Sequence, residues 1–150
     1  MSNEESIEHW QSGGKTDWVL EKLIALANRG IGIIVTLNVG GFLISGRVTS
    51  EGQYFEGISK SLKSGLEASK IEGPFTELDG IFNWGADAIE GSVQEAVFIH
   101  LEDARIFHPA GLPIPADRGE LWRGRLDSID GFTFASLGAR LTRVRQEDLQ

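Results

Sequence analysis

The chain has 150 residues, no cysteine and a net charge of −8. This length suggests a single domain, residues 1–150, and the lack of cysteine excludes disulfides and thiolate chemistry. The 14 acids against seven bases in residues 1–100 argue against general nucleic-acid binding, which needs a basic face. No apolar run reaches the roughly 18 residues of a membrane span, and the acidic first residues do not resemble a signal peptide. We therefore expect a cytoplasmic protein with no membrane contact.

Residues 1–15 are polar, and we expect a loose lead-in there. Its Gly13-Gly14-Lys15-Thr16 resembles the end of a phosphate loop, but the first glycine of that motif would fall at His9 and no strand precedes it. Nucleotide binding is therefore not indicated.

A helix is predicted over 17–29, with Thr16 or Asp17 as its cap and Gly30 as its stop. Its apolar positions share one face; they are Val19, Leu20, Leu23, Ile24 and Ala27.

Residues 31–50 are predicted to form a β-hairpin. Apolar and polar residues alternate on both sides of Gly40-Gly41, and two glycines tolerate the positive φ of a tight turn. A two-residue loop there pairs Val39 with Phe42 and leaves Gly46 opposite Val35. This register puts both apolar sets on one face.

A helical insertion is expected over 53–90. Its first helix, roughly Gln53 to Ser69, is amphipathic but weakened by Gly57 and Gly65. A short third helix is predicted from Pro74. Residues 65–95 are acidic, rich in glycine and poorly periodic.

The remaining strands are expected in 96–137, followed by a polar tail, 138–150. The apolar phase shifts inside the first of these strands, which predicts a bulge at Glu102-Asp103. Residues 121–126 and 132–135 are predicted to be the last two strands.

Together these elements predict an α+β fold that is mainly antiparallel β. We expect a small, partly open barrel of five or six strands, SH3-like or Sm-like, with an N-terminal helix and the helical insertion. Tyr54, Phe55 and Ile58 are expected to cap the barrel. The predicted barrel core consists of Val35, Leu37, Ile44, Val48, Trp122, Leu126, Phe132 and Phe134.

Three aromatic side chains, Phe75, Phe82 and Trp84, remain once this core is filled. They lie among glycines and acids, and we expect them to stay partly exposed as a protein-binding site. The alternative is that they complete the core.

Catalytic chemistry is not indicated. His100, Glu102 and His108 are the nearest approach to a metal-ligand set, but their spacing favours ordinary strand residues, so neither a metal nor a cofactor is predicted. Arg123 and Arg125 share one strand face and are candidate contacts for a carboxylate or phosphate. Ion pairing with neighbouring acids is the simpler interpretation of both.

Two blocks of sequence resemble the gas vesicle accessory protein U family. They are VTLNVGGFLISGRVTSEGQYFEGIS, and FIHLEDARIF followed after a loop by LWRGRLDSIDGFTFASL. The resemblance covers 17–66 and 96–137; residues 67–95 have no counterpart in it, and the tail after Leu137 is short.

The resemblance implies a non-enzymatic helper in gas vesicle assembly, maturation or clustering. Its expected partners are gas vesicle structural or accessory proteins and further copies of itself. A second hypothesis is an Sm-like RNA-binding or scaffold module, which the strand and glycine pattern tolerates and the acidic charge opposes.

Overall fold

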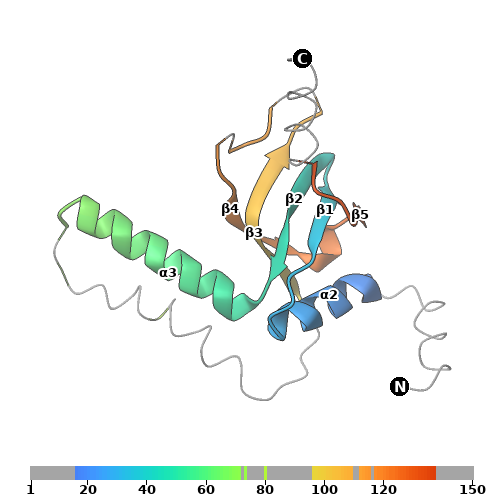
Figure 1. Cartoon of the computed structure of the whole chain (residues 1–150), viewed down its shortest axis with the longest axis horizontal. Helices are drawn as coiled ribbons and strands as arrows, with labels where there is room; N and C mark the ends of the chain where they lie inside the picture. Colours follow the sequence, from blue (N-terminus) through green and yellow to red (C-terminus); the bar gives the residue numbers. More distant parts are fainter. Residues whose placement is uncertain are drawn as a thin grey trace, which may run out of the picture.

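The computed structural model describes residues 16–71, 73, 80, 96–109, 112–115 and 117–137. Two helices, α2 (Trp18–Asn28) and α3 (Glu51–Ala68), accompany a five-stranded antiparallel sheet (Figure 1). The strands, in the spatial order β4-β3-β2-β1-β5, are β1 (Ile34–Val39), β2 (Phe42–Thr49), β3 (Phe98–Phe107), β4 (Glu120–Arg125) and β5 (Gly131–Thr133). A short 3-10 helix, η1 (Leu126–Ser128), follows β4.

Helix α2 begins and ends where the sequence predicts. The Asp17 side chain accepts a hydrogen bond from the backbone N–H of Val19, which satisfies one of the free donors of the first turn. At the other end Gly30 has a φ of +85°, a conformation that stops a helix and suits glycine.

The β1–β2 hairpin has the predicted turn and register. Gly40 and Gly41 have φ values of +58° and +86°, and Val39 pairs with Phe42 across them. Gly46 lies opposite Val35, as expected. A Cβ at Gly46 would be 3.0 Å from the Glu102 carbonyl oxygen, so glycine there allows β3 to approach closely.

The predicted bulge in β3 is confirmed. The register of β3 with β4 shifts between Leu101 and Ala104, and Asp103 has a φ of +49°. The extra residue brings Ala104 back into the core on the same face as Leu101.

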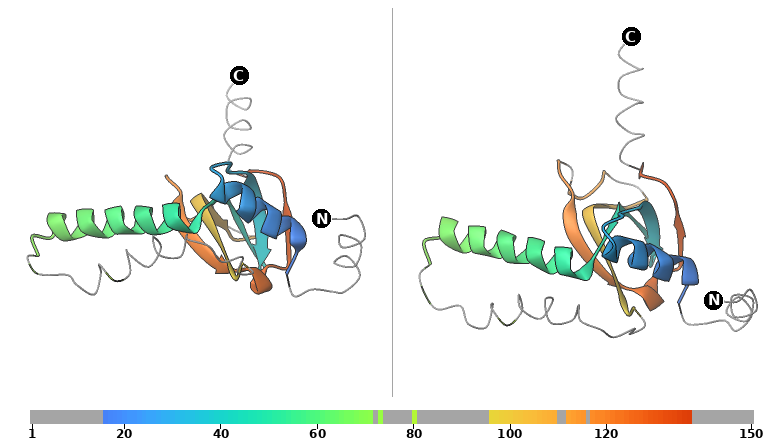
Figure 2. Two further views of the ribbon diagram at one scale, coloured as in Figure 1. Left: turned by 90° about the horizontal axis from the view of Figure 1, so that it is seen from below. Right: turned by 60° about the horizontal axis from the view of Figure 1, so that its bottom comes forward.

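The sheet curls but is not closed into a barrel within the described residues (Figure 2). The predicted partly open barrel of five or six strands is therefore wrong as a barrel, while the antiparallel pairing is confirmed and the strands number five. The physical reason lies in the last segment. β5 pairs with β1 over three residues only, and the chain then crosses the outer face, where Thr36 donates to the Ala135 carbonyl and Ser45 accepts from Leu137 N–H.

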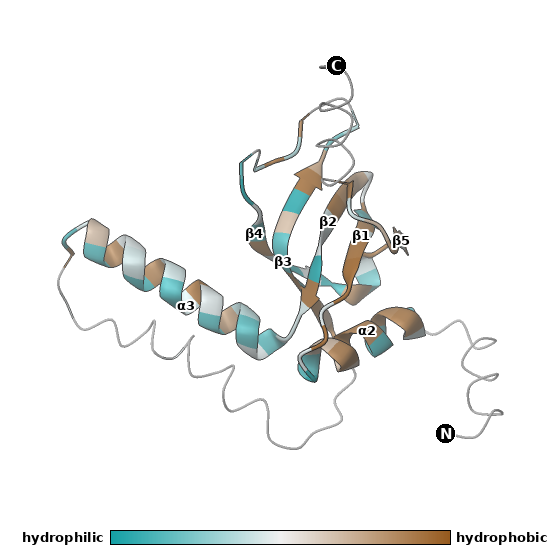
Figure 3. Cartoon of the chain, in the orientation of Figure 1, coloured by the Kyte–Doolittle hydropathy of each residue, from teal (hydrophilic) through white to brown (hydrophobic). Residues whose placement is uncertain are grey.

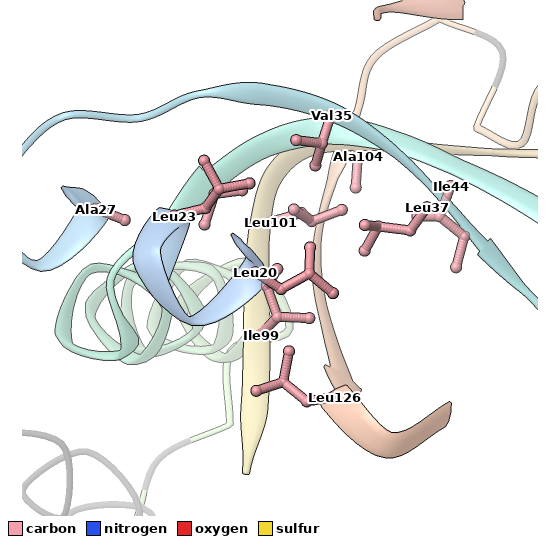
Figure 4. Packing of buried hydrophobic residues seen from close by; sticks show 11 residues of the cluster. Leu20, Leu23, Ala27, Val35, Leu37, Ile44, Ile99, Leu101, Ala104 and Leu126 are labelled. Carbon is pink, nitrogen blue, oxygen red and sulfur yellow. The ribbon is translucent and has the colours of Figure 1, made fainter. Parts of the chain in front are cut away.

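The core lies between α2 and the inner face of the sheet. Figure 4 shows Leu20 and Leu23 of α2 pointing toward Ile99 and Leu101 of β3. The buried cluster comprises Leu20, Leu23, Ala27, Val35, Leu37, Ile44, Val48, Ile99, Leu101, Ala104 and Leu126.

Two predictions about the core need correction. Phe134 is 62% exposed and packs edge-on against Phe132, because the strand ends at Thr133 before Phe134 could turn inward. Tyr54 and Phe55 do not cap a barrel end. They contact His100, which alternates with Ile99 and Leu101 and so faces away from the core.

Candidate protein-binding surface

Helix α3 is attached to the sheet directly at its first residue. Ser50 ends the connection from β2 and caps the helix, its hydroxyl accepting a hydrogen bond of 3.1 Å from Gln53 N–H. The Gln53 side chain in turn accepts from the Thr49 hydroxyl at 2.9 Å. Ser50 is the single residue between β2 and α3, and these bonds hold it in place. The direction of the helix therefore follows from that of the strand.

An aromatic cluster packs the first turns of α3 on the outer face of the sheet. The Tyr54 ring lies 4.8 Å from the His100 ring, and Phe55 is buried beside both. A Cβ at Gly57 would lie 2.6 Å from Leu121 Cδ1, so this glycine, which lowers helix propensity, allows the helix to lie close to β4.

Arg123 of β4 also contacts the aromatic cluster. Its guanidinium lies 3.9 Å from the centre of the Phe98 ring and 5.3 Å from that of Phe55, both within cation–π range. It also pairs with Glu51 in the first turn of α3 at 3.7 Å. These contacts give Arg123 a structural part in holding the helix.

His100 is the most confined polar group of this cluster. It is 4% exposed, and its Nε2 has no hydrogen-bond partner among the described residues. Burial, followed by the positive charge of Arg123, lowers the pKa of His100 from 6.5 to about 4. The imidazole is therefore neutral at pH 7 beneath the docked helix.

The second half of α3 leaves the sheet and projects away from it (Figures 1 and 2). We define the projecting half as residues 60–68; all of them except Leu66 are exposed. We define the α3 stripe as Phe55, Ile58, Leu62 and Leu66, which the helical period places on one side. At its first residues the α3 stripe contacts the sheet, and it then continues past the edge of the sheet.

The projecting half is amphipathic, as the alternating bands of Figure 3 show. Leu62 remains 41% exposed, and Gly65 beside it has open space where a Cβ would be. An apolar stripe that continues beyond the body of a protein is typical of a surface that pairs with another chain.

The other residues singled out by sequence have different environments. Phe75, Phe82 and Trp84 lie outside the described residues. Arg125, with a side chain that is 61% exposed, pairs through two nitrogens with Asp127, at 3.0 and 2.6 Å. Arg123 and Arg125 thus both face carboxylates, which lends no support to phosphate binding.

The described ranges contain neither a cluster of metal-ligand side chains nor a membrane-spanning helix. They contain no group of three or more His, Asp or Glu side chains that could hold a metal ion. No helix in these ranges has the length and apolar content needed to cross a membrane.

The sequence did not predict that the projecting half of α3 is a candidate binding surface. Leu62 and Leu66 were part of a predicted amphipathic helix, but the pattern does not say where the supporting sheet ends. A signal was present in the run of small and basic residues from Ser59 to Lys70, which contains few apolar side chains for a core.

Comparison with known proteins gives one match. A family model described as "Gas vesicle protein GvpU-like" matches residues 17–137, a range that takes in every described helix and strand. No curated protein and no solved structure matches the chain.

Proposed function

Since the chain belongs to the GvpU-like gas vesicle protein family, we propose that it is a non-enzymatic accessory protein of gas vesicles. It acts through protein–protein contacts in vesicle assembly, maturation or clustering. The observation that carries this proposal is the α3 stripe, which continues past the sheet into the projecting half. A helix presenting leucines outside the body of the protein suits binding to another protein.

The proposal is tested by flotation. Intact gas vesicles from the organism that encodes the chain are mixed with the purified protein and centrifuged, and the buoyant layer is probed for the chain. Wild-type protein should float with the vesicles. The double variant Leu62→Ser, Leu66→Ser should remain in the lower layer, because it loses the apolar side chains of the projecting half.

A matched control changes the other side of the same helix. Ser64→Ala with Ala68→Ser alters two exposed positions at least about 120° from Leu62 around the helix, and this variant should float like the wild type. Failure of the wild-type protein to float would overturn the proposed association with vesicles. Flotation of the leucine variant would remove the α3 stripe from it.

We also propose that Phe75, Phe82 and Trp84 contribute to binding, since they are aromatic residues in an acidic stretch that follows α3. Changing all three to serine should leave the melting temperature within a few degrees and abolish flotation. Unfolding of this variant would instead assign the three rings to the core.

Self-association is a further part of the proposal. Both edges of the sheet, β4 and β5, pair on one side only within the described part of the chain, and open edges can pair with another copy. Light scattering should give a mass above the 16.4 kDa of one chain. A mass of one chain at high concentration would contradict it.

A further inference from the structure

Helix α3 is held on the sheet by a contact that is separate from the main core. The core cluster lies on the inner face with α2, and none of its members comes from α3. Of the 18 residues of α3, all of them described, Phe55 alone is buried, and it packs on the outer face beside His100. A segment with so little buried apolar surface can open while the rest of a domain stays folded.

One polar group lies at the centre of this contact. The His100 ring lies 4.8 Å from the Tyr54 ring and 6.3 Å from the Phe55 ring, measured between ring centres. Its Nε2 is buried and has no hydrogen-bond partner in the described part of the chain. A neutral imidazole can keep that nitrogen free of hydrogen, whereas an imidazolium carries a hydrogen on both nitrogens. Protonation would therefore place a charged donor without an acceptor beneath the helix.

The charged groups around His100 also oppose a positive imidazole. Arg123 pairs with His100 across β3 and β4, and like charges this close repel. From α3 the groups that face it are Tyr54 and Glu51, and Glu51 already pairs with Arg123 at 3.7 Å. The residue opposite His100 on β2 is the uncharged Thr49. The other charged groups along this face are in ion pairs, Arg47 with Glu102 and Arg125 with Asp127.

We propose that the contact between α3 and the sheet is a pH-sensitive switch, in which protonation of His100 releases α3 while the core of the sheet stays folded. The docked helix accommodates the neutral imidazole, and release lets water hydrate the imidazolium. Ser50, the single residue between β2 and α3, is the point about which the helix would move. This inference concerns the attachment of α3 and does not depend on the proposed function.

The pKa of His100 gives the size of the effect. In the docked form, burial and then Arg123 lower this pKa from 6.5 to about 4, and in the released form water restores the ordinary value. The ratio of released to docked molecules should therefore rise about 30-fold as the pH falls from 7.5 to 5. Once released, α3 should lose its helical hydrogen bonds, because an isolated helix of 18 residues with three glycines is marginal in water.

Hydrogen exchange on the full chain, corrected for the intrinsic rate at each pH, measures this release. Amides of residues 55–59 report the opening of α3. The Val48 amide, bonded to the Ile33 carbonyl at 2.9 Å, reports the opening of the core strands. The α3 amides should be less protected than Val48 at every pH, and their protection should fall about 30-fold more from pH 7.5 to pH 5 in the wild type than in His100→Gln.

Two further variants make the result specific. His100→Phe keeps an aromatic ring beside Tyr54 and Phe55 and cannot take up a proton, so it should behave like His100→Gln. Glu51→Gln removes the carboxylate that pairs with Arg123 and leaves the imidazole in place, so it should keep the fall in protection of the wild type.

Three results would overturn the inference. Equal protection of the α3 amides and Val48 at each pH would mean that α3 opens only when the whole domain unfolds. A fall of the same size in the wild type, His100→Gln and His100→Phe would mean that another group senses the acid. A fall that disappears in Glu51→Gln would assign the effect to that carboxylate. None of these results bears on flotation with vesicles at pH 7.5, which tests the proposed function separately.

Discussion

Acid should destabilise this protein in part through His100. The folded state holds the imidazole neutral beneath Tyr54 and Phe55, beside the positive charge of Arg123. In the unfolded chain the same group has its ordinary pKa. As pH falls below 6.5 the unfolded chain binds a proton that the folded chain does not, so the free energy of unfolding decreases until the pH reaches about 4.

The size of this effect follows from the two pKa values. Lowering the pKa of His100 from 6.5 to about 4 corresponds to about 3 kcal/mol when the whole interval is crossed, at about 1.4 kcal/mol per pKa unit. By pH 5 about 2 kcal/mol of this should already be lost. That is a large fraction of the stability of a typical domain, which is about 5–15 kcal/mol.

Urea unfolding followed by tryptophan fluorescence at several pH values between 7.5 and 4.5 measures the effect. Carboxylates also titrate in this range, so the comparison is between wild type and His100→Gln. The decrease in unfolding free energy from pH 7.5 to pH 5 should be about 2 kcal/mol smaller in that variant than in the wild type. Equal pH dependence of wild type and His100→Gln would refute the reasoning.

Three further changes test other parts of the structure. Replacing Gly40 and Gly41 by valines should cost about 1–3 kcal/mol in urea unfolding, because β-branched residues resist positive φ; an unchanged melting temperature would refute the turn. Ser50→Ala removes the cap of α3 and should cost about 1 kcal/mol; equal unfolding midpoints would count against the cap. Leu62→Ser with Leu66→Ser should leave the melting temperature within a few degrees, and a larger loss would place these leucines in the core.

Local features of the fold could be predicted because short-range physics determines them. Asp17 and Gly30 bound α2 through capping and positive φ, which depend on residue type and immediate neighbours. Gly40-Gly41 and the alternating pattern specify the hairpin register together. The bulge near Asp103 was visible as a change of phase within one strand.

The site was predicted less well, because the exposure of a side chain depends on which other elements of the fold pack against it. Phe134 looked like a core residue in an alternating strand, but the strand stops at Thr133 and leaves the ring exposed. Leu62 lies in the predicted amphipathic helix, of which Tyr54, Phe55 and Ile58 were expected to pack on the body of the protein. Its exposure results from the length of α3 relative to the sheet that supports it.

The sequence by itself determined α2 with its caps, the hairpin register and the bulge, since each is encoded within a few residues. Only the tertiary structure decided which face of the sheet receives α3, because Phe55 finds His100 and Arg123 from strands more than forty residues further along the chain. The same packing buries the imidazole, lowers its pKa and directs the rest of α3 away from the sheet. These properties depend on contacts between segments that are distant in the sequence, and the periodicity of a single segment cannot predict such contacts.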